Sequence, residues 1–459
     1  MTHSTTSRAG ENGGLPDDGA LLAVRDLKTH FPVRGALLGR GGREVVKAVD
    51  GVTFDIRGGE VFGLVGESGS GKTTLGRSIL KLAEPTSGEV LYRGRDLVPL
   101  SEREMRPLRR ELGLIFQDPH AALNPAMTIV QGVGHPLRIH GLVESRTEAR
   151  ARVATMLDRV GLHPPERFLD IYPEDLSGGQ KQRLVIARAL ITEPRFVVAD
   201  EPVAALDMSV RARVLELMLE LGRDLDLTYL FITHDLATAR FLCDRIGILY
   251  LGNLVEWGPA DRLFDDPQHP YTRSLLSAIP LPEAGRRVRA EMLPRGEIPD
   301  AARPPAGCRF HPRCPEAFAV CGWEGRDLVE ALEERWTKVD EETFERELAL
   351  VGRLDNIDVG REHVHFPSGD AVGLAAWLKE HGPSLPAPVF SGVTDVAAEH
   401  GGVTVRFRAG PEPGKQEVAG RQVACHLHGV VLRPGGDHVG EPEAEDFADY
   451  RPPEPSWRR

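Results

Sequence analysis

A glycine-rich segment between residues 66 and 74 has the composition of a phosphate-binding loop. It reads GESGSGKTT and fits the pattern G-x-x-x-x-G-K-S/T. An apolar run at 61–65 precedes it and a helical pattern follows it, which is the context that this loop requires. Glycines let backbone N–H groups and the helix N-terminus face phosphates, Lys72 adds positive charge, and the Thr73 hydroxyl can bind Mg²⁺. We therefore favour this interpretation over a chance glycine-rich turn. The candidate ATP contacts in the loop are Gly66, Glu67, Ser68, Gly69, Ser70, Gly71, Lys72, Thr73 and Thr74.

Two carboxylates end a second apolar run. Residues 196–201 read FVVADE, the pattern of a buried strand that ends in Asp200 and Glu201. Asp200 is placed to hold Mg²⁺ through water, and Glu201 can polarise the water that attacks the terminal phosphate. For these two residues alone, an acidic strand end facing solvent would be the simpler interpretation. Beside a phosphate-binding loop, we favour the catalytic one.

An eight-residue segment, LSGGQKQR at 176–183, places a serine before a helix. Ser177 caps that helix, and the Gly178 and Gly179 amides lie at its positive end, which makes an anion site without a lysine of its own. The segment resembles the signature of ATP-binding-cassette (ABC) ATPases. The resemblance implies that Ser177, Gly178, Gly179 and Gln180 complete the nucleotide site of a partner subunit. Two ATP molecules would then be held head-to-tail between two cassettes.

Other elements of this family follow in the family's order. Gln117, in IFQDP, resembles the Q-loop glutamine that touches Mg²⁺ and the attacking water, and His234, in FITHD, resembles the switch histidine that contacts the γ-phosphate. Asp207, in ALD, resembles the D-loop at the dimer seam. The chain departs from the family in having Val203-Ala204 where Thr-Ser is usual, so this loop lacks two hydroxyls that would bond across the dimer. Because Glu201 and His234 are retained, we expect hydrolysis.

The resemblance also implies an aromatic residue that stacks on adenine shortly after the first strand. Phe31, in HFPV, is the candidate. Packing of Phe31 in the core is an equally good interpretation.

Four further segments resemble the ATPases of oligopeptide and dipeptide importers. They are VKAVDGV at 46–52, LNP at 123–125, HPYTRSLL at 269–276 and GCRFHPRCP at 307–315. The resemblance covers roughly residues 21–325 and a block at 420–427. It implies two transmembrane permease subunits, an extracytoplasmic solute-binding protein and a paralogous ABC ATPase in a heterodimer as partners. The Gly/Arg-rich stretch at 35–43 suits the second of two paralogous ATPases.

Four cysteines lie late in the chain: Cys308, Cys314, Cys321 and Cys425. Their spacing is not the C-x₂-C pairing of a zinc ribbon, but four thiolates can carry a 4Fe–4S cluster or zinc. Some members of this importer branch hold a 4Fe–4S cluster here, and the resemblance implies the same, with a structural role. Two alternatives remain open. One is a zinc ion bound by three of the cysteines and by His311, His426 or His428, and the other is a set of thiols without any ligand. Cys243 is predicted to be packed core.

The elements that position these residues alternate between strand-like and helical patterns, which predicts an α/β fold with a mostly parallel sheet. This pattern and the resemblance together predict a P-loop NTPase ABC cassette. Such a cassette has a RecA-like sheet core with a helical subdomain, here at about 118–180. A small C-terminal extension would carry the cysteine cluster. Strands are predicted at 61–65, 112–116, 196–199 and 229–233, and helices at 73–82, 147–160, 178–191 and 210–221. Between 118 and 175 we predict one clear helix.

The predicted organisation has four parts. These are a disordered tail at 1–20, a nucleotide-binding domain at 21–285, a C-terminal region at 286–432 and a disordered tail at 433–459. The C-terminal region includes an insertion at 326–419, which begins with an acidic helical stretch at 327–351. Residues 352–420 show no motif, so the sequence assigns no role to them.

The net charge and the hydropathy of the chain restrict the kinds of partner that it can have. The net charge of −12 argues against nucleic acid as a partner, and a cassette ATPase acting on nucleic acid or ribosomes would need a basic surface or duplicated cassettes. The sequence has no apolar run of the roughly 18–20 residues that a membrane span needs, and its N-terminus is not of signal-peptide type. We expect a peripheral ATPase on the cytoplasmic face of the membrane, whose permease partner binds a groove lined by residues near 118–127. A degenerate cassette that binds ATP and hardly turns over is the alternative.

Overall fold

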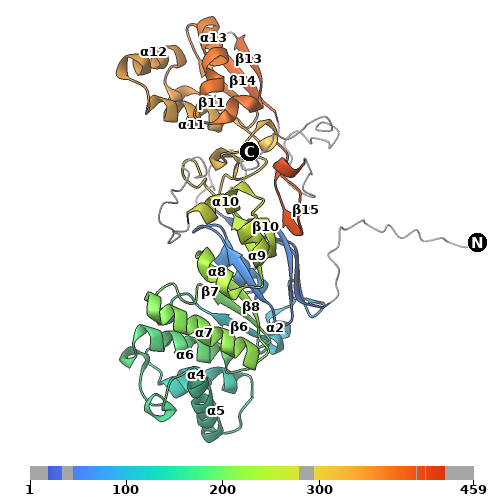
Figure 1. Ribbon diagram of the computed structural model, residues 1–459, viewed down its shortest axis with the longest axis vertical. Helices are drawn as coiled ribbons and strands as arrows, with labels where there is room; N and C mark the ends of the chain where they lie inside the picture. Colours follow the sequence, from blue (N-terminus) through green and yellow to red (C-terminus); the bar gives the residue numbers. More distant parts are fainter. Residues whose placement is uncertain (1–18, 34–44, 279–293, 400, 409, 430–459) are drawn as a thin grey trace, which may run out of the picture.

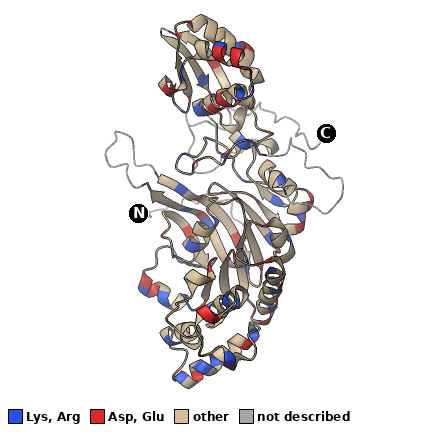
Figure 2. Ribbon diagram, turned by 90° about the vertical axis from the view of Figure 1, so that its left-hand side faces the viewer, with Lys and Arg blue, Asp and Glu red and all other residues tan. Residues whose placement is uncertain are grey.

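The computed structural model describes residues 19–33, 45–278, 294–399, 401–408 and 410–429. The predicted tails, apart from residues 19 and 20, and the Gly/Arg-rich stretch therefore lie outside the described residues. The described chain is elongated: the helices between residues 129 and 224 lie toward one end, and residues 325–399 and 401–407 form the other end (Figure 1). Figure 2 shows charged residues of both signs on the helices at both ends and on parts of the chain between them.

Over the described residues, the central sheet has eight strands in the order β15-β16-β10-β9-β3-β8-β7-β6. Strands β9, β3, β8, β7 and β6 pair in parallel, and β10, β16 and β15 continue the sheet in antiparallel fashion. The parallel strands are apolar and buried on both faces, as helices covering a parallel sheet require. The bounds are β3 Val61–Val65, β6 Leu112–Ile115, β7 Phe196–Asp200, β8 Thr228–Thr233, β9 Arg245–Tyr250, β10 Asn253–Pro259, β15 Gln416–Val418 and β16 Arg421–Val423.

A second, antiparallel sheet packs beside the first. In the described chain its order is β2-β1-β4-β5, with β1 Ala20–Pro32, β2 Val45–Arg57, β4 Ser87–Tyr92 and β5 Arg95–Asp96. Helix α1 (Lys72–Ile79) buries Leu75 and Ile79 in the core between the two sheets, where Phe54 and Phe62 stack at 4.9 Å. Helix α2 (Glu102–Leu108) follows the second sheet in the chain and contributes Met105 to the same core. This core fixes the start of α1, and therefore the phosphate-binding loop, against both sheets.

The predicted strands are confirmed to within one residue at each end, and the predicted helices to within three. Helices α5 (Arg146–Arg159) and α6 (Gly178–Leu190) nearly coincide with the predicted ranges. Helix α7 (Met208–Asp224) begins two residues earlier than predicted, because the Asp207 side chain caps it. The remaining cassette helices are α8 Leu236–Leu242, α9 Ala260–Asp265 and α10 Pro270–Ser277.

The prediction of one helix between 118 and 175 was wrong. Besides α5, this stretch forms α3 (Pro119–Ala122) and α4 (Ile129–Ile139). Two glycines and Pro136 interrupt the helical pattern of α4, which obscures it in the sequence. The helix is nevertheless stabilised by the capping box of Thr128 and Gln131 and by an apolar face that is buried against α5 and α6.

Residues 325–407 are here called the inserted domain, and their buried residues belong to the same hydrophobic cluster as those of the central sheet. In the described part of this domain, an antiparallel sheet runs in the order β11-β12-β14-β13, accompanied by three α-helices. The predicted acidic stretch is two helices, α11 and α12, rather than one, and the motif-free residues form the rest of the domain. The bounds are α11 Gly325–Trp336, α12 Glu341–Val351, β11 Asp358–Val359, β12 His363–Pro367, α13 Ala371–His381, β13 Val393–Glu399 and β14 Gly402–Phe407.

Among the residues that the structure describes, none of the helices combines the length and hydropathy needed to cross a bilayer.

We predict that ATP binding is independent of the packing of the inserted domain. Leu374, on α13, is completely buried, and its replacement by Ala should cost about 2–5 kcal/mol of the domain's free energy of unfolding. Urea unfolding followed by tryptophan fluorescence should show one weakened transition, with ATP binding unchanged. Val372→Ala on the same helix is the control, since Val372 is 75% exposed and should cost less than about 0.5 kcal/mol. A loss of ATP binding with Leu374→Ala would contradict this independence.

Candidate nucleotide-binding site

The glycine-rich loop lies between β3 and α1, as predicted. Gly71 caps α1 with φ of 102°, and a Cβ atom there would lie 2.0 Å from the carbonyl oxygen of Ala48. A Cβ atom on Gly66 would lie 2.2 Å from the carbonyl oxygen of Leu249. Both positions therefore require glycine, because neighbouring backbone presses directly against the loop.

Lys72 extends over the loop that it follows. Its Nζ donates to the carbonyl oxygens of Gly66 and Glu67 at 2.8 and 2.9 Å. Burial lowers the pKa of Lys72, while the carboxylates of Glu201, Asp200 and Glu67 oppose that shift. The ammonium group is thus held at the loop among negative charges, where a phosphate would be its natural further partner.

Two of the three predicted Mg²⁺ ligands, Thr73 and Asp200, lie next to each other. The Thr73 hydroxyl donates to Asp200 Oδ1 at 3.0 Å, and Asp200 is buried at the end of β7. Burial raises the pKa of Asp200, opposed by the hydrogen bond from Thr73. An oxygen pair of this kind suits a hard divalent cation.

Three predicted residues meet at the edge of the sheet. Glu201 Oε2 lies 3.2 Å from Gln117 Nε2 and 3.2 Å from His234 Nδ1. Each of the three follows the carboxyl end of a parallel strand, β6, β7 or β8, and these ends adjoin. Glu201 itself has φ of 45°, a left-handed conformation that is uncommon outside glycine and typical of functional sites. The structure therefore brings a carboxylate, an amide and an imidazole together within hydrogen-bonding distance.

The signature serine caps α6, as predicted. Gln180 N donates to Ser177 Oγ at 3.4 Å, and Ser177 N donates to Gln180 Oε1 at 2.9 Å. Ser177 and Gly178 are exposed, so the positive end of α6 faces solvent rather than the protein's own loop. Its role toward a partner's nucleotide stays a prediction.

The D-loop segment is ordered by its aspartate. Asp207 accepts hydrogen bonds from Val210 N at 3.0 Å and from Ser209 Oγ at 2.8 Å, which lower its pKa. Val203 is buried, whereas Ala204 is exposed and Met208 is 86% exposed. Of the two positions that lack the family's hydroxyls, only 204 faces solvent.

Phe31 is 43% exposed on β1, so the interpretation that it packs in the core was wrong. Stacking on adenine stays a prediction.

The four late cysteines are all buried, and their thiols act on one another electrostatically. Burial raises the pKa of Cys308 to about 11, and burial followed by the charges of Cys321, Cys425 and Cys308 raises the pKa of Cys314. Cys425 therefore joins the other three across the whole inserted domain. Among the described residues, however, no three His, Cys, Asp or Glu side chains are grouped so as to hold one metal ion.

His311 does not fit the alternative of a zinc site. Its Nδ1 lies 2.8 Å from the carbonyl oxygen of Cys308, and its Nε2 lies 3.0 Å from Asp327 Oδ2. Both ring nitrogens therefore have partners within the protein, which does not support the alternative in which His311 binds zinc. Cys243 is buried behind Gly63, as predicted for packed core.

Two residues that contact the phosphate-binding loop were not predicted. Glu67 N donates to the Tyr271 hydroxyl at 3.0 Å, and Arg313 Nη1 donates to Glu67 Oε2 at 2.7 Å. Both lie in segments that the sequence singled out, HPYTRSLL and CRFHPRC, but only as marks of resemblance. The partners in these two hydrogen bonds are 204 and 246 residues apart in the sequence, so no local pattern of residues indicates them.

A phosphate-binding loop, paired carboxylates and an exposed helix N-terminus on this mixed sheet define a P-loop ATPase of the cassette class. Residues 49–204 match the ABC transporter family, and residues 255–321 match the oligopeptide/dipeptide transporter C-terminal region.

The names of proteins with similar sequences agree with this class. The putative oligopeptide transport ATP-binding protein YkfD of Bacillus subtilis is 48% identical over 314 residues, which is 68% of this chain and 92% of the relative. The oligopeptide transport ATP-binding protein AppF of Bacillus subtilis is 46% identical over 313 residues, 68% of this chain and 94% of the relative. A putative peptide import ATP-binding protein of Brucella ovis is 50% identical over 301 residues, 66% of this chain and 91% of the relative.

The chain belongs to the ABC transporter family, among the ATP-binding proteins that carry the oligopeptide/dipeptide transporter C-terminal region. The resemblance predicted from the sequence is thereby confirmed. Proteins of this family are ATPases, and this chain is one.

Proposed function

We propose that this chain is the ATP-hydrolysing subunit of an ABC importer for peptides, and that it couples closure of a cassette dimer to uptake through membrane permease subunits. The observation that supports this most directly is the meeting of Gln117, Glu201 and His234 beside the phosphate-binding loop. Relatives named for oligopeptide transport support the class of solute. An extracytoplasmic solute-binding protein would deliver that solute.

In the proposed reaction, the loop residues and Lys72 bind the phosphates, and Thr73, Asp200 and Gln117 hold Mg²⁺. Glu201 polarises the attacking water, and His234 contacts the γ-phosphate. The exposed N-terminus of α6, with Ser177 and Gly178, completes the site of the partner cassette by the attraction of a helix N-terminus for anions. We propose a paralogous cassette as that partner, with Asp207 at the seam and Phe31 on adenine.

Hydrolysis is tested by Glu201→Gln, which removes the carboxylate proposed as the general base but keeps the shape of the side chain. We expect ATP hydrolysis to fall by on the order of 100- to 10,000-fold while ATP binding persists, because general bases contribute about that much. The ATP-loaded variant should also pair with its partner cassette, as measured by light scattering. Glu216→Gln, on the exposed face of α7, is the matched control. A wild-type single-turnover rate no faster than that of Glu201→Gln would instead indicate a cassette that binds ATP and hardly turns over.

A groove supports docking of the permease, which would hold the chain on the cytoplasmic face of the membrane. Its cavity of about 200 Å³ lies among β6, α4 and α6, next to Gln117. Phe116, His140 and Arg188 are among its lining residues, whereas residues 118–127, which we predicted to line it, are not. An apolar and basic groove between sheet and helices can receive a short helix from another subunit.

We predict that His140→Glu separates hydrolysis from coupling. The new carboxylate would face Arg106 and Arg110, which already act on His140, so the fold should be retained. Basal ATP hydrolysis should stay within about twofold, since His140 is not among the residues proposed for catalysis, while copurification with the permease subunits is lost. Ile139→Gln, at the exposed neighbouring position, should keep both. Unimpaired copurification of the His140 variant would exclude this groove as the docking site.

A 4Fe–4S cluster is proposed for the four late cysteines. All four thiols are buried and act on one another electrostatically, which fits a four-thiolate donor set. When bound, the cluster would link residues 308–321 to Cys425 as a structural brace.

We predict that anaerobically purified protein contains iron and acid-labile sulfide in equal amounts. Cys425→Ser should lose both, because one of four ligands is removed, and Cys243→Ser should keep both, because Cys243 is packed core. Colorimetric iron and sulfide assays provide the measurement. Four freely titratable thiols without iron, or stoichiometric zinc, would contradict the cluster.

A further inference from the structure

Glu67 is the residue at which the C-terminal part of the chain touches the phosphate-binding loop. Arg313 Nη1 and Nη2 donate to its two carboxylate oxygens at 2.7 and 3.2 Å, a bidentate ion pair. Its backbone N–H donates to the Tyr271 hydroxyl at 3.0 Å. Both the charge and the backbone of Glu67 are thus held by segments that follow the cassette's parallel strands.

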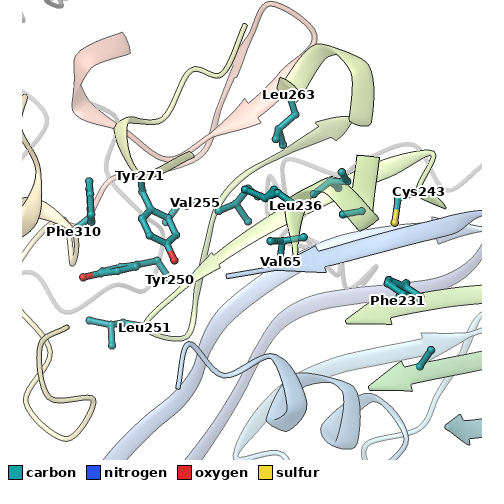
Figure 3. Packing of buried hydrophobic residues seen from close by; sticks show 14 of the residues in the cluster. Val65, Phe231, Leu236, Cys243, Tyr250, Leu251, Val255, Leu263, Tyr271 and Phe310 are labelled. Carbon is teal, nitrogen blue, oxygen red and sulfur yellow. The ribbon is translucent and has the colours of Figure 1, made fainter. Parts of the chain in front are cut away.

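Arg313 is held rigidly. Its side chain is only 8% exposed, its Nε donates to the carbonyl oxygen of Arg295 at 3.3 Å, and Arg295 N donates back to the carbonyl oxygen of Arg313 at 3.0 Å. The guanidinium lies 5.9 Å from the centre of the Tyr250 ring. Tyr250 in turn packs edge-on against Tyr271 and Phe310 (Figure 3). The arginine therefore presents its charge to Glu67 in one orientation.

The negative charge of the Glu67 carboxylate is unfavourable in a loop that binds a triphosphate. Its side chain is 24% exposed, and the carboxylates of Asp200 and Glu201 already lie near Lys72. An additional negative charge within the loop would repel phosphate groups unless a cation neutralises it. Arg313 is the cation that pairs with it, on the side of the loop that faces the C-terminal extension.

We propose that Arg313 is a positioning residue for ATP binding. It neutralises Glu67 and keeps that carboxylate turned toward the C-terminal extension rather than toward the phosphates. The affinity of the cassette for ATP thereby depends on the segment that carries Cys308 and Cys314. This inference rests on ATP binding by the loop and not on the solute that is transported.

The test is rescue of one substitution by another, with the dissociation constant of ATP measured by competition with a fluorescent ATP analogue. Arg313→Met should weaken ATP binding about tenfold, because it leaves Glu67 charged and unpaired. Glu67→Gln alone should bind ATP more tightly than Arg313→Met does, because it leaves no unpaired carboxylate in the loop. The double variant should recover to within about threefold, because the unpaired charge is gone. Arg313→Lys should keep most of the affinity, and in hydrolysis assays Arg313→Met should raise KM while kcat is retained.

Arg421→Met is the matched control. Arg421 is another buried arginine of the C-terminal extension, but its partners are Asp266 and the carbonyl oxygen of Arg262, away from the loop. This variant should lower thermal stability without changing ATP affinity. An unchanged affinity in Arg313→Met, a failure of Glu67→Gln to restore it, or an equal loss in Arg421→Met would each overturn the proposal. Wild-type protein that does not bind ATP would instead overturn the function of the loop itself.

Discussion

Parallel pairing of the central strands is the constraint on which the ATP site depends. Val65 pairs with Thr233, Asp200 with Ile232, and Ile115 with Ala199, so the strands end at one edge of the sheet. The loop, Gln117, Glu201 and His234 each follow directly from such an end. Because side chains alternate between faces, a shift of one residue in any pair would turn its functional residue away from the others. One backbone register therefore assembles groups that come from four separate segments.

The C-terminal extension is built into this arrangement rather than attached to it. Strand β16 continues the central sheet by pairing with β10, and Arg309 forms a buried ion pair with Asp50 on β2. The same segment brings the four cysteines together and sends Arg313 to the loop. The inserted domain, in contrast, projects from the end opposite to the helical subdomain (Figure 1). About a third of the chain lies outside the alignment with YkfD, which agrees with additions to a shared cassette.

Most of the cassette could be predicted from the sequence because its elements carry local signals. Apolar runs of strand length, the glycine pattern and the capping serine at 177 each act within a few residues. Helix α4 was missed because Gly132, Gly134 and Pro136 interrupt its apolar pattern, and its buried face becomes recognisable only where it packs against neighbouring helices. The inserted domain was missed because short antiparallel strands such as β11 and β12 are specified by their partners more than by their own residues.

The sequence by itself determined the chemistry: a phosphate-binding loop, two carboxylates after a strand and a signature helix. It could do so because those residue types, at those spacings, have few other uses. Only the tertiary structure decided which groups meet. The hydrogen bonds of Glu201 with Gln117 and His234, the occupied ring of His311, and the ion pair of Arg313 with Glu67 join residues that are up to 246 positions apart. Such contacts arise from the packing of whole sheets and helices, which no local pattern of residues records.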